Sequence, residues 1–224
     1  MRYLSAIIFF LFQLAGTSIP AQLVFSPRAE GLPVSLPFRL YDSSLHDTIE
    51  IDVLRFYIGP VELMQGGAVV HRIRQPYFLV DADKPASMRI GLPAGLQFDR
   101  IRFGLGVDSL TSVSGVFPDD LDPVNGMYWT WQSGYINFKM EGSSSKINTA
   151  NGRFQFHVGG YLPPFNTYRI LQVPAGRGGL TEVQFDLAGL LGQIRLAENP
   201  VLMTPGKAAV EFADRLAFYF RGTH

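Results

Sequence analysis

Apolar and polar side chains alternate residue by residue in several segments of this chain, and this pattern limits its fold more than any other feature. Strict alternation puts every second side chain on one face, as in a β-strand that buries one face and leaves the other in water. In 135–141, for example, Ile136, Phe138 and Met140 share a face. The alternating segments are 48–58, 99–107, 135–141, 153–158 and 182–187, with weaker candidates at 77–80 and 23–25. We therefore predict an all-β fold of mainly antiparallel strands.

Turn-forming residues separate the predicted strands. Glycine, proline and asparagine gather at 59–60, 66–67, 92–95, 125–126, 151–152 and 178–179. Many short strands divided in this way are typical of an antiparallel β-sandwich or a barrel-like domain. The chain has 224 residues, a length that suits a single domain with one core.

One helix is predicted close to the C-terminus. Thr204 can cap it and Pro205 suits its first turn. An apolar stripe with helical spacing follows, formed by Ala209, Phe212, Ala213, Leu216 and Phe220. We expect this short helix to pack its stripe against the β-structure.

The first residues have the order of a secretory signal peptide, which we place at 1–22. Arg2 supplies the positive start, an apolar run covers 7–12, and small and turn-forming residues follow as far as Ala21. This run is too short to span a bilayer, and no later run is long enough to do so. We expect cleavage near Ala21 or Gln22 and a mature domain over 23–224. The expected location is periplasmic or secreted, in a Gram-negative bacterium.

Charge, cysteine content and missing motifs exclude several classes of protein. The 19 basic and 19 acidic residues balance, so nothing in the charge favours nucleic acid as a partner. The chain has no cysteine, which excludes disulfides, thiolate metal sites and cysteine nucleophiles. It also lacks a nucleophile elbow, a His-Glu-x-x-His zinc motif and a phosphate-binding loop. We therefore expect a protein that is not itself an enzyme.

The segment 127–135, which reads MYWTWQSGY, contains both tryptophans of the chain, Trp129 and Trp131. Residues two apart on a strand share a face, so two indoles could form a floor of the core. If exposed, they would instead make a platform on which a carbohydrate or another ligand stacks. Tryptophan is also easily oxidised, so the segment is a candidate for chemistry on the ring itself.

Histidine is scarce, and none of the four lies within local metal-ligand spacing of another. His157 is the most informative, because it lies on the polar face of a predicted strand just before Gly159-Gly160. His46, His71 and His224 are read as surface positions. The acidic run 119–123 fits either a calcium site or a turn with solvated carboxylates, since it lacks the spacing of an EF-hand loop.

Several of these segments together resemble the MbnP-like proteins. The most specific element is 127–135, with its Trp-x-Trp-Gln-x-Gly-Tyr pattern, preceded by Leu121-Asp122-Pro123. Weaker matches are LRFYI at 54–58, IRFGLGV at 101–107, FHVG at 156–159 and MTPG at 203–206. The resemblance covers nearly the whole predicted mature chain.

This resemblance implies a function. MbnP-like proteins are exported partners of di-haem, MauG-like cytochrome c peroxidases, which oxidise one of their tryptophans to kynurenine. The new amine and ketone then form a copper site together with histidines. Carried onto this chain, the resemblance makes Trp129 or Trp131 the modified residue and His157 a copper ligand, with Met127 as a possible soft ligand.

The chain departs from the family pattern at two points. Much of the family has an Asn-His pair shortly after the Gly-Val element, whereas 107–113 here contains no histidine. Much of the family also has disulfide-forming cysteines, which this chain lacks. The sequence therefore predicts a cysteine-free branch of the family with one histidine ligand, and not two. A ligand-binding β-sandwich and a plain scaffold with buried tryptophans are the alternatives.

Overall fold

The structure is a computed structural model that describes residues 21–43, 45–131 and 134–223. The predicted signal peptide lies outside these residues except for its last two, and His224 lies outside them as well. The first described strand begins at Gln22, and Ala21 before it is buried.

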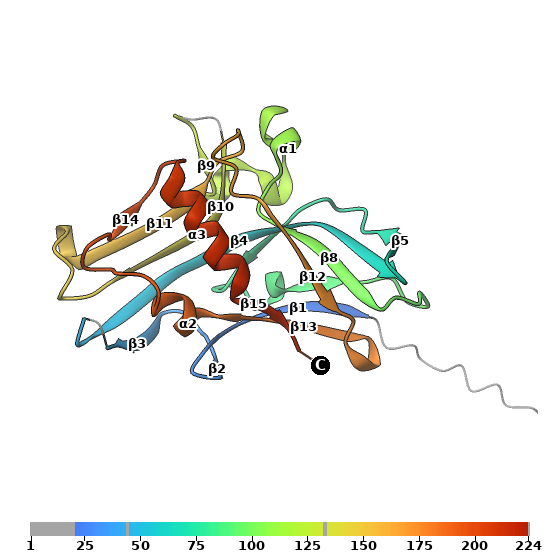
Figure 1. The fold of residues 1–224 in the computed structure, drawn as a ribbon, viewed down its shortest axis with the longest axis horizontal. Coiled ribbons are helices and arrows are strands. Elements are labelled where there is room, and N and C mark those ends of the chain that lie inside the picture. The colour runs from blue at the N-terminus through green and yellow to red at the C-terminus, as the bar shows by residue number, and fades with distance from the viewer. Residues whose placement is uncertain (1–20, 44, 132–133, 224) are drawn as a thin grey trace, which may run out of the picture.

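The chain is built mainly from strands, as predicted (Figure 1). The strands are β1 (Gln22–Ala29), β2 (Leu32–Pro33), β3 (Phe38–Asp42), β4 (Asp47–Gln65), β5 (Ala68–Arg72), β6 (Phe78–Asp81), β7 (Arg89–Gly91), β8 (Arg100–Leu105), β9 (Tyr128–Trp129), β10 (Gly134–Ser143), β11 (Arg153–Gly159), β12 (Arg169–Pro174), β13 (Leu180–Asp186), β14 (Val201–Leu202) and β15 (Phe220–Gly222). The α-helices are α1 (Ser109–Val113), α2 (Leu187–Leu191) and α3 (Lys207–Phe218). Single 3₁₀ turns lie at Pro85–Met88, Asp119–Leu121, Pro123–Asn125, Ala150–Gly152 and Arg177–Gly179. Across the described residues, no helix is long and apolar enough to cross a membrane.

The strands form two sheets. The larger one has the order β12–β8–β4–β10–β11–β14, with β3, β5 and β6 also paired to β4 and β9 paired to β10. The smaller one has the order β15–β13–β1–β2, with β7 also paired to β1. Most pairings are antiparallel, which confirms the predicted fold class, but β1–β13 and β11–β14 are parallel.

Phenylalanines join the two sheets in the core. Phe185 of the smaller sheet stacks on Phe220 and meets Phe56 and Phe138 of the larger sheet edge-on. These edge-to-face contacts are a favoured geometry for aromatic rings. Helix α3 lies across the larger sheet, where Phe212 packs on Phe138 and Phe156 (Figure 1).

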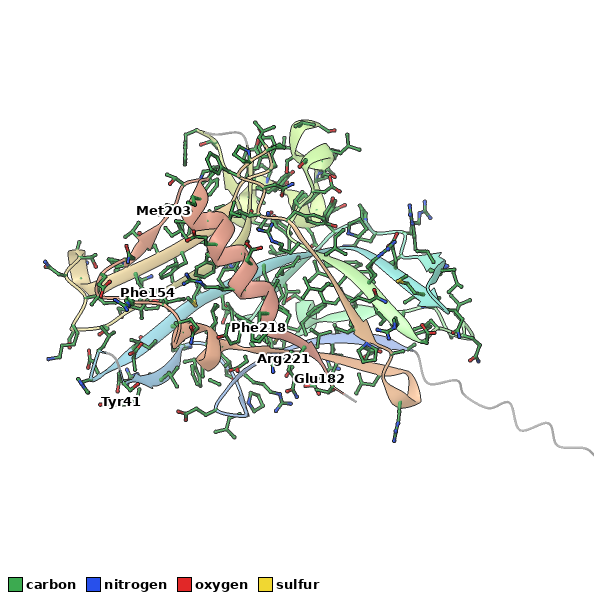
Figure 2. The ribbon with its side chains drawn as sticks, in the orientation of Figure 1. Tyr41, Phe154, Glu182, Met203, Phe218 and Arg221 are labelled. Atoms are coloured by element: carbon green, nitrogen blue, oxygen red, sulfur yellow. The ribbon has the colours of Figure 1, made fainter. Side chains whose placement is uncertain are left out.

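The C-terminal helix is present, but its boundaries differ from the prediction. It begins after Gly206, which makes no side-chain capping bond, so Thr204 is not its cap. Its buried stripe is Ala209, Phe212, Ala213 and Leu216. The helix ends at Phe218, near Arg221 in Figure 2, and Phe220 belongs to β15.

The predicted turn at Gly59-Pro60 is wrong, because β4 runs straight through it. The register with β8 shifts between Ile58 and Val61, so the pair forms a bulge in the strand. Gly59 has a φ of 150°, and a Cβ there would lie 2.0 Å from the carbonyl oxygen of Pro76. Gly59-Pro60, which predicted a turn, thus marks a bulge where two backbone segments pack closely.

Candidate functional site

The two tryptophans lie at the end of the short strand β9 and differ sharply in burial. Trp129 pairs with Gly134 of β10 and is 5% exposed. Trp131 follows the end of the strand, in a turn, and is 62% exposed. Their ring centroids are 5.6 Å apart with an interplanar angle of 42°. The pair therefore forms one contact unit that runs from the surface to the interior.

The ring of Trp129 lies directly against the backbone of β11. A Cβ on Gly159 would come within 2.8 Å of Cζ3 of Trp129, so only glycine leaves room for the indole here. The indole Nε1 is buried and finds no hydrogen-bond acceptor among the described residues. A buried donor without an acceptor typically costs about 1–3 kcal/mol, so this nitrogen calls for an explanation.

A small pocket of about 260 Å³ lies beside Trp129. Its walls are Trp129, the two glycines Gly134 and Gly160, Pro205 and the loop residues Tyr161, Leu162, Pro163, Pro164 and Phe165. The indole is thus almost fully buried but borders a pocket with room for small molecules.

His157 lies on the same face of β11 as Gly159. Phe154, Phe156 and Val158 point into the core, so the alternation puts His157 and Gly159 on the opposite face. Two residues along a strand span roughly 7 Å, so the backbone of His157, whose imidazole is buried, lies about that far from Gly159 and its contact with Trp129.

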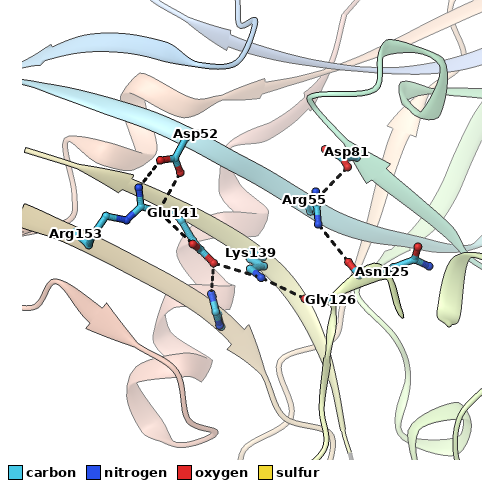
Figure 3. Close-up of polar contacts among 9 residues, drawn as sticks. Asp52, Arg55, Asp81, Asn125, Gly126, Lys139, Glu141 and Arg153 are labelled. Carbon is cyan, nitrogen blue, oxygen red and sulfur yellow. Dashed lines mark hydrogen bonds and ion pairs between the residues drawn. The ribbon is translucent and has the colours of Figure 1, made fainter. Parts of the chain in front are cut away.

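Glu141 of β10, which Figure 3 shows among Lys139, Arg153 and Asp52, fixes the orientation of this imidazole. His157 Nε2 and Glu141 Oε1 are 2.8 Å apart. Lys139 and Arg153 also pair with the carboxylate, at 3.3 and 3.2 Å, and Arg153 reaches on to Asp52. The hydrogen bond from His157 and the charge of Lys139 lower the pKa of Glu141 to about 2.

The hydrogen bond to an ionised carboxylate assigns the roles of the two ring nitrogens. At neutral pH the carboxylate is ionised and only accepts, so Nε2–H of His157 donates to it. In the neutral imidazole, Nδ1 then keeps its lone pair. A carboxylate that binds one ring nitrogen and leaves the other free is the usual arrangement around a metal-binding histidine.

Met127 lies in a second apolar cluster, at the same end of the molecule. It is fully buried with Tyr57, Tyr135 and Trp129. Its place suits a core residue, and the prediction that its sulfur binds a metal remains a prediction. Within the described ranges, no group of three or more His, Cys, Asp or Glu side chains is placed to hold a metal ion.

The other positions singled out in the sequence serve local structure. His46 is exposed in a turn, and His71 lies half-buried on β5. In the acidic run, Asp120 accepts hydrogen bonds from Leu79 N and Gln75 Nε2, and Asp122 accepts from Val124 N. These bonds favour the turn interpretation of the run over the calcium site.

The comparisons with known proteins concern the family and the fold. The model of the MbnP family matches residues 18–204, which is most of the chain. The chain belongs to the MbnP family. Among solved structures, MbnP from Methylosinus trichosporium is similar in fold, with a TM-score of 0.60 and 15% sequence identity over 85% of this chain and 82% of that one. A search of curated proteins finds no match.

Where much of the MbnP family has an Asn-His pair, this chain starts helix α1. Asp108 caps that helix by accepting a hydrogen bond from Thr111 N, and it also accepts one from Tyr77 Oη at 2.5 Å. The carboxylate is therefore already engaged on both oxygens. Among the described histidines of this MbnP family member, His157 is the one that shares a strand face with Gly159, on which Trp129 packs.

Sequence reasoning missed the role of Glu141 at this site. Its only local signal is its place on the polar face of 135–141, which many solvated residues share. The register that sets Lys139 opposite His157, and Glu141 opposite Gln155, depends on the pairing of β10 with β11. That pairing follows from the whole sheet and not from either strand alone.

The contact between Gly159 and Trp129 gives a direct test of the site geometry. Gly159→Ala is expected to lower the free energy of unfolding by about 1–3 kcal/mol and to shift the tryptophan fluorescence, because the added methyl group meets the indole and the Tyr135 carbonyl. Gly91→Ala is the matched control, since a Cβ there meets nothing within 4 Å. Urea unfolding measures both variants, and equal stability of the two would contradict the tight contact.

Proposed function

We propose that this MbnP family protein is exported and binds copper after a di-haem, MauG-like cytochrome c peroxidase has oxidised Trp129 to kynurenine. In this proposal the protein is the substrate of the oxidation and not a catalyst, and copper is its cargo. The observation that carries the proposal is the place of Trp129. Its ring packs on Gly159, beside His157 on the same strand face, and its Nε1 is buried without an acceptor.

The donor atoms of these residues fit copper once the ring is opened. An indole N–H only donates, whereas the aryl amine of kynurenine has a lone pair. His157 offers Nδ1 as a second nitrogen, because Glu141 occupies Nε2. Imidazole and neutral amine suit copper better than carboxylates do. Met127, in the same apolar cluster as Trp129, is a possible third, soft ligand.

A second candidate function, binding of a carbohydrate or another ligand by stacking, is favoured by the exposure of Trp131. Its ring is open to solvent over most of its surface, as a stacking platform requires. Trp129 beneath it is buried, so the platform would consist of one indole and not two.

Mass spectrometry tests the proposed oxidation. The full chain is produced together with a di-haem MauG-like peroxidase, supplied with hydrogen peroxide, and its intact mass and peptides are measured. Conversion of Trp129 to kynurenine removes one carbon and adds one oxygen, so we expect a gain of about 4 Da in the peptide that contains Trp129. An unchanged mass in the presence of active peroxidase would contradict the proposal.

Copper titration of the modified protein tests the ligand role of His157. His157→Ala is expected to weaken copper binding by at least about 100-fold, since even partners that only orient a metal-bound histidine contribute about 10–100-fold. His71→Ala is the matched control, because His71 lies on β5, outside the site. Equal copper affinity of the two variants would remove His157 from the site.

A further inference from the structure

We propose that Trp131 is the electron relay through which Trp129 is oxidised: an oxidant at the surface takes an electron from Trp131, and Trp131 then takes one from Trp129. The proposal deepens the proposed function, on which it rests for the identity of the oxidant. It assigns different roles to two tryptophans that the sequence leaves equivalent.

The geometry of the pair gives the first argument. Trp129 is 95% shielded and cannot be touched by an oxidant held inside another protein, whereas most of Trp131 is open. The two rings are in contact, with centroids 5.6 Å apart. The rate of electron transfer falls steeply with distance. Transfer between two rings in contact is therefore faster than direct transfer from the buried ring to an oxidant at the surface.

The surroundings of the pair explain why the lasting change falls on Trp129. Its ring borders the 260 Å³ pocket, which can hold the water that adds to the oxidised ring. Trp131 is mostly open to solvent and does not line this pocket, and its contact with Trp129 lets it regain an electron from that ring. Trp129 packs on Gly159, which shares a strand face with His157, so the altered Trp129 is better placed than Trp131 for metal binding.

Two nearby tyrosines, Tyr57 and Tyr135, are harder to oxidise than the two tryptophans. Tyr135 contacts Tyr57 and Tyr128, at 5.8 and 5.1 Å between ring centroids. A phenol must lose its proton when it is oxidised, and burial raises the pKa of both Tyr57 and Tyr135. Tyr57 Oη donates to the carbonyl oxygen of Asp120, which does not readily take up a proton. Oxidation of Tyr57 and Tyr135 is therefore disfavoured relative to oxidation of the two indoles.

Hydrogen peroxide is the final acceptor of the electrons that leave Trp129. Conversion of tryptophan to kynurenine with water consumes three waters and releases formic acid, four protons and four electrons. Each electron passes from Trp129 to Trp131 and then to the haem of the peroxidase, where two molecules of hydrogen peroxide take up the four electrons and four protons and become four waters. Trp131 is restored after each transfer and is not consumed.

A surface oxidant that needs no partner enzyme tests the relay by itself. Flash-generated tris(bipyridine)ruthenium(III) is too bulky to enter the protein, so it oxidises exposed side chains. We expect oxidation products at Trp129 in the wild type, about tenfold fewer in Trp131→Phe, and partial recovery in Trp131→Tyr, because tyrosine can be oxidised and phenylalanine cannot. Tyr41→Phe, which alters an exposed ring on β3, is expected to leave the yield unchanged.

Peptide mapping gives the result for each variant, and matching circular dichroism spectra verify that the variants are folded. Equal yields at Trp129 in the wild type and Trp131→Phe would overturn the relay, and so would products confined to Trp131 in the wild type. A failure of the peroxidase to form kynurenine would instead count against the proposed function, while the ruthenium experiment still decides the relay.

Discussion

Replacing Phe185 with alanine is expected to lower the free energy of unfolding by about 3–5 kcal/mol, the usual cost of removing a fully buried phenylalanine ring. Phe185 has no exposed surface and stacks on Phe220 with centroids 4.5 Å apart. It also meets Phe56 and Phe138, which belong to the other sheet. The truncation opens a cavity at the point where the two sheets join, and rigid strands on both sides limit how far the cavity can close.

Phe218→Ala is the control, because it removes the same ring from the surface. Phe218 is 64% exposed; the guanidinium carbon of Arg221 lies 4.7 Å from its ring centroid, and Tyr219 meets the ring edge-on (Figure 2). We expect a loss below about 1 kcal/mol, the scale of an exposed cation–π contact. Urea unfolding at neutral pH compares the two variants. A loss at Phe185 no larger than that at Phe218 would show that the sheets are not held together by this cluster.

The strands were predictable because their pattern is local. Ile136, Phe138 and Met140 alternate in the sequence, and all three are buried in β10. The pairing partners were not predictable, since β4 alone pairs with β3, β5, β6, β8 and β10. A strand with so many neighbours is defined by contacts far apart in the chain, which no local pattern records.

The candidate site shows the same division between local and distant information. The resemblance to the MbnP-like proteins pointed to the tryptophans through 127–135 and to His157 through 156–159. The spacing of Trp129 and Trp131 predicted a shared face, and the structure differs because β9 ends at Trp129 and leaves Trp131 in a turn. Strand ends depend on the partner strand as well as on the residue itself, so the different burial of the two rings could not be read from the sequence.

Glu141→Gln is expected to lower the free energy of unfolding by about 2 kcal/mol at pH 7. The carboxylate accepts the hydrogen bond of His157 and pairs with Lys139 and Arg153, and it is largely buried. Its pKa falls from 4.5 to about 2, a shift that corresponds to about 3 kcal/mol of stabilisation. We expect a smaller loss, because Arg153 is partly open to solvent and water screens its charge. Glutamine keeps the shape of the side chain and removes the charge that the two cations need.

The pH dependence of this loss separates a charge effect from a packing effect. Because the pKa of Glu141 is lower in the folded protein than in the unfolded chain, its contribution is fully present above about pH 4.5 and disappears as the pH falls toward 2. Other carboxylates also titrate in this range, so the informative quantity is the difference between wild type and Glu141→Gln, measured by urea unfolding at several pH values. Glu198→Gln, which removes the charge of an exposed pair with Arg195, is expected to differ from wild type by less than about 0.5 kcal/mol throughout. A Glu141→Gln difference that stays constant between pH 7 and pH 3 would mean that the loss comes from altered hydrogen bonds or packing at the amide, and not from the missing charge of the carboxylate.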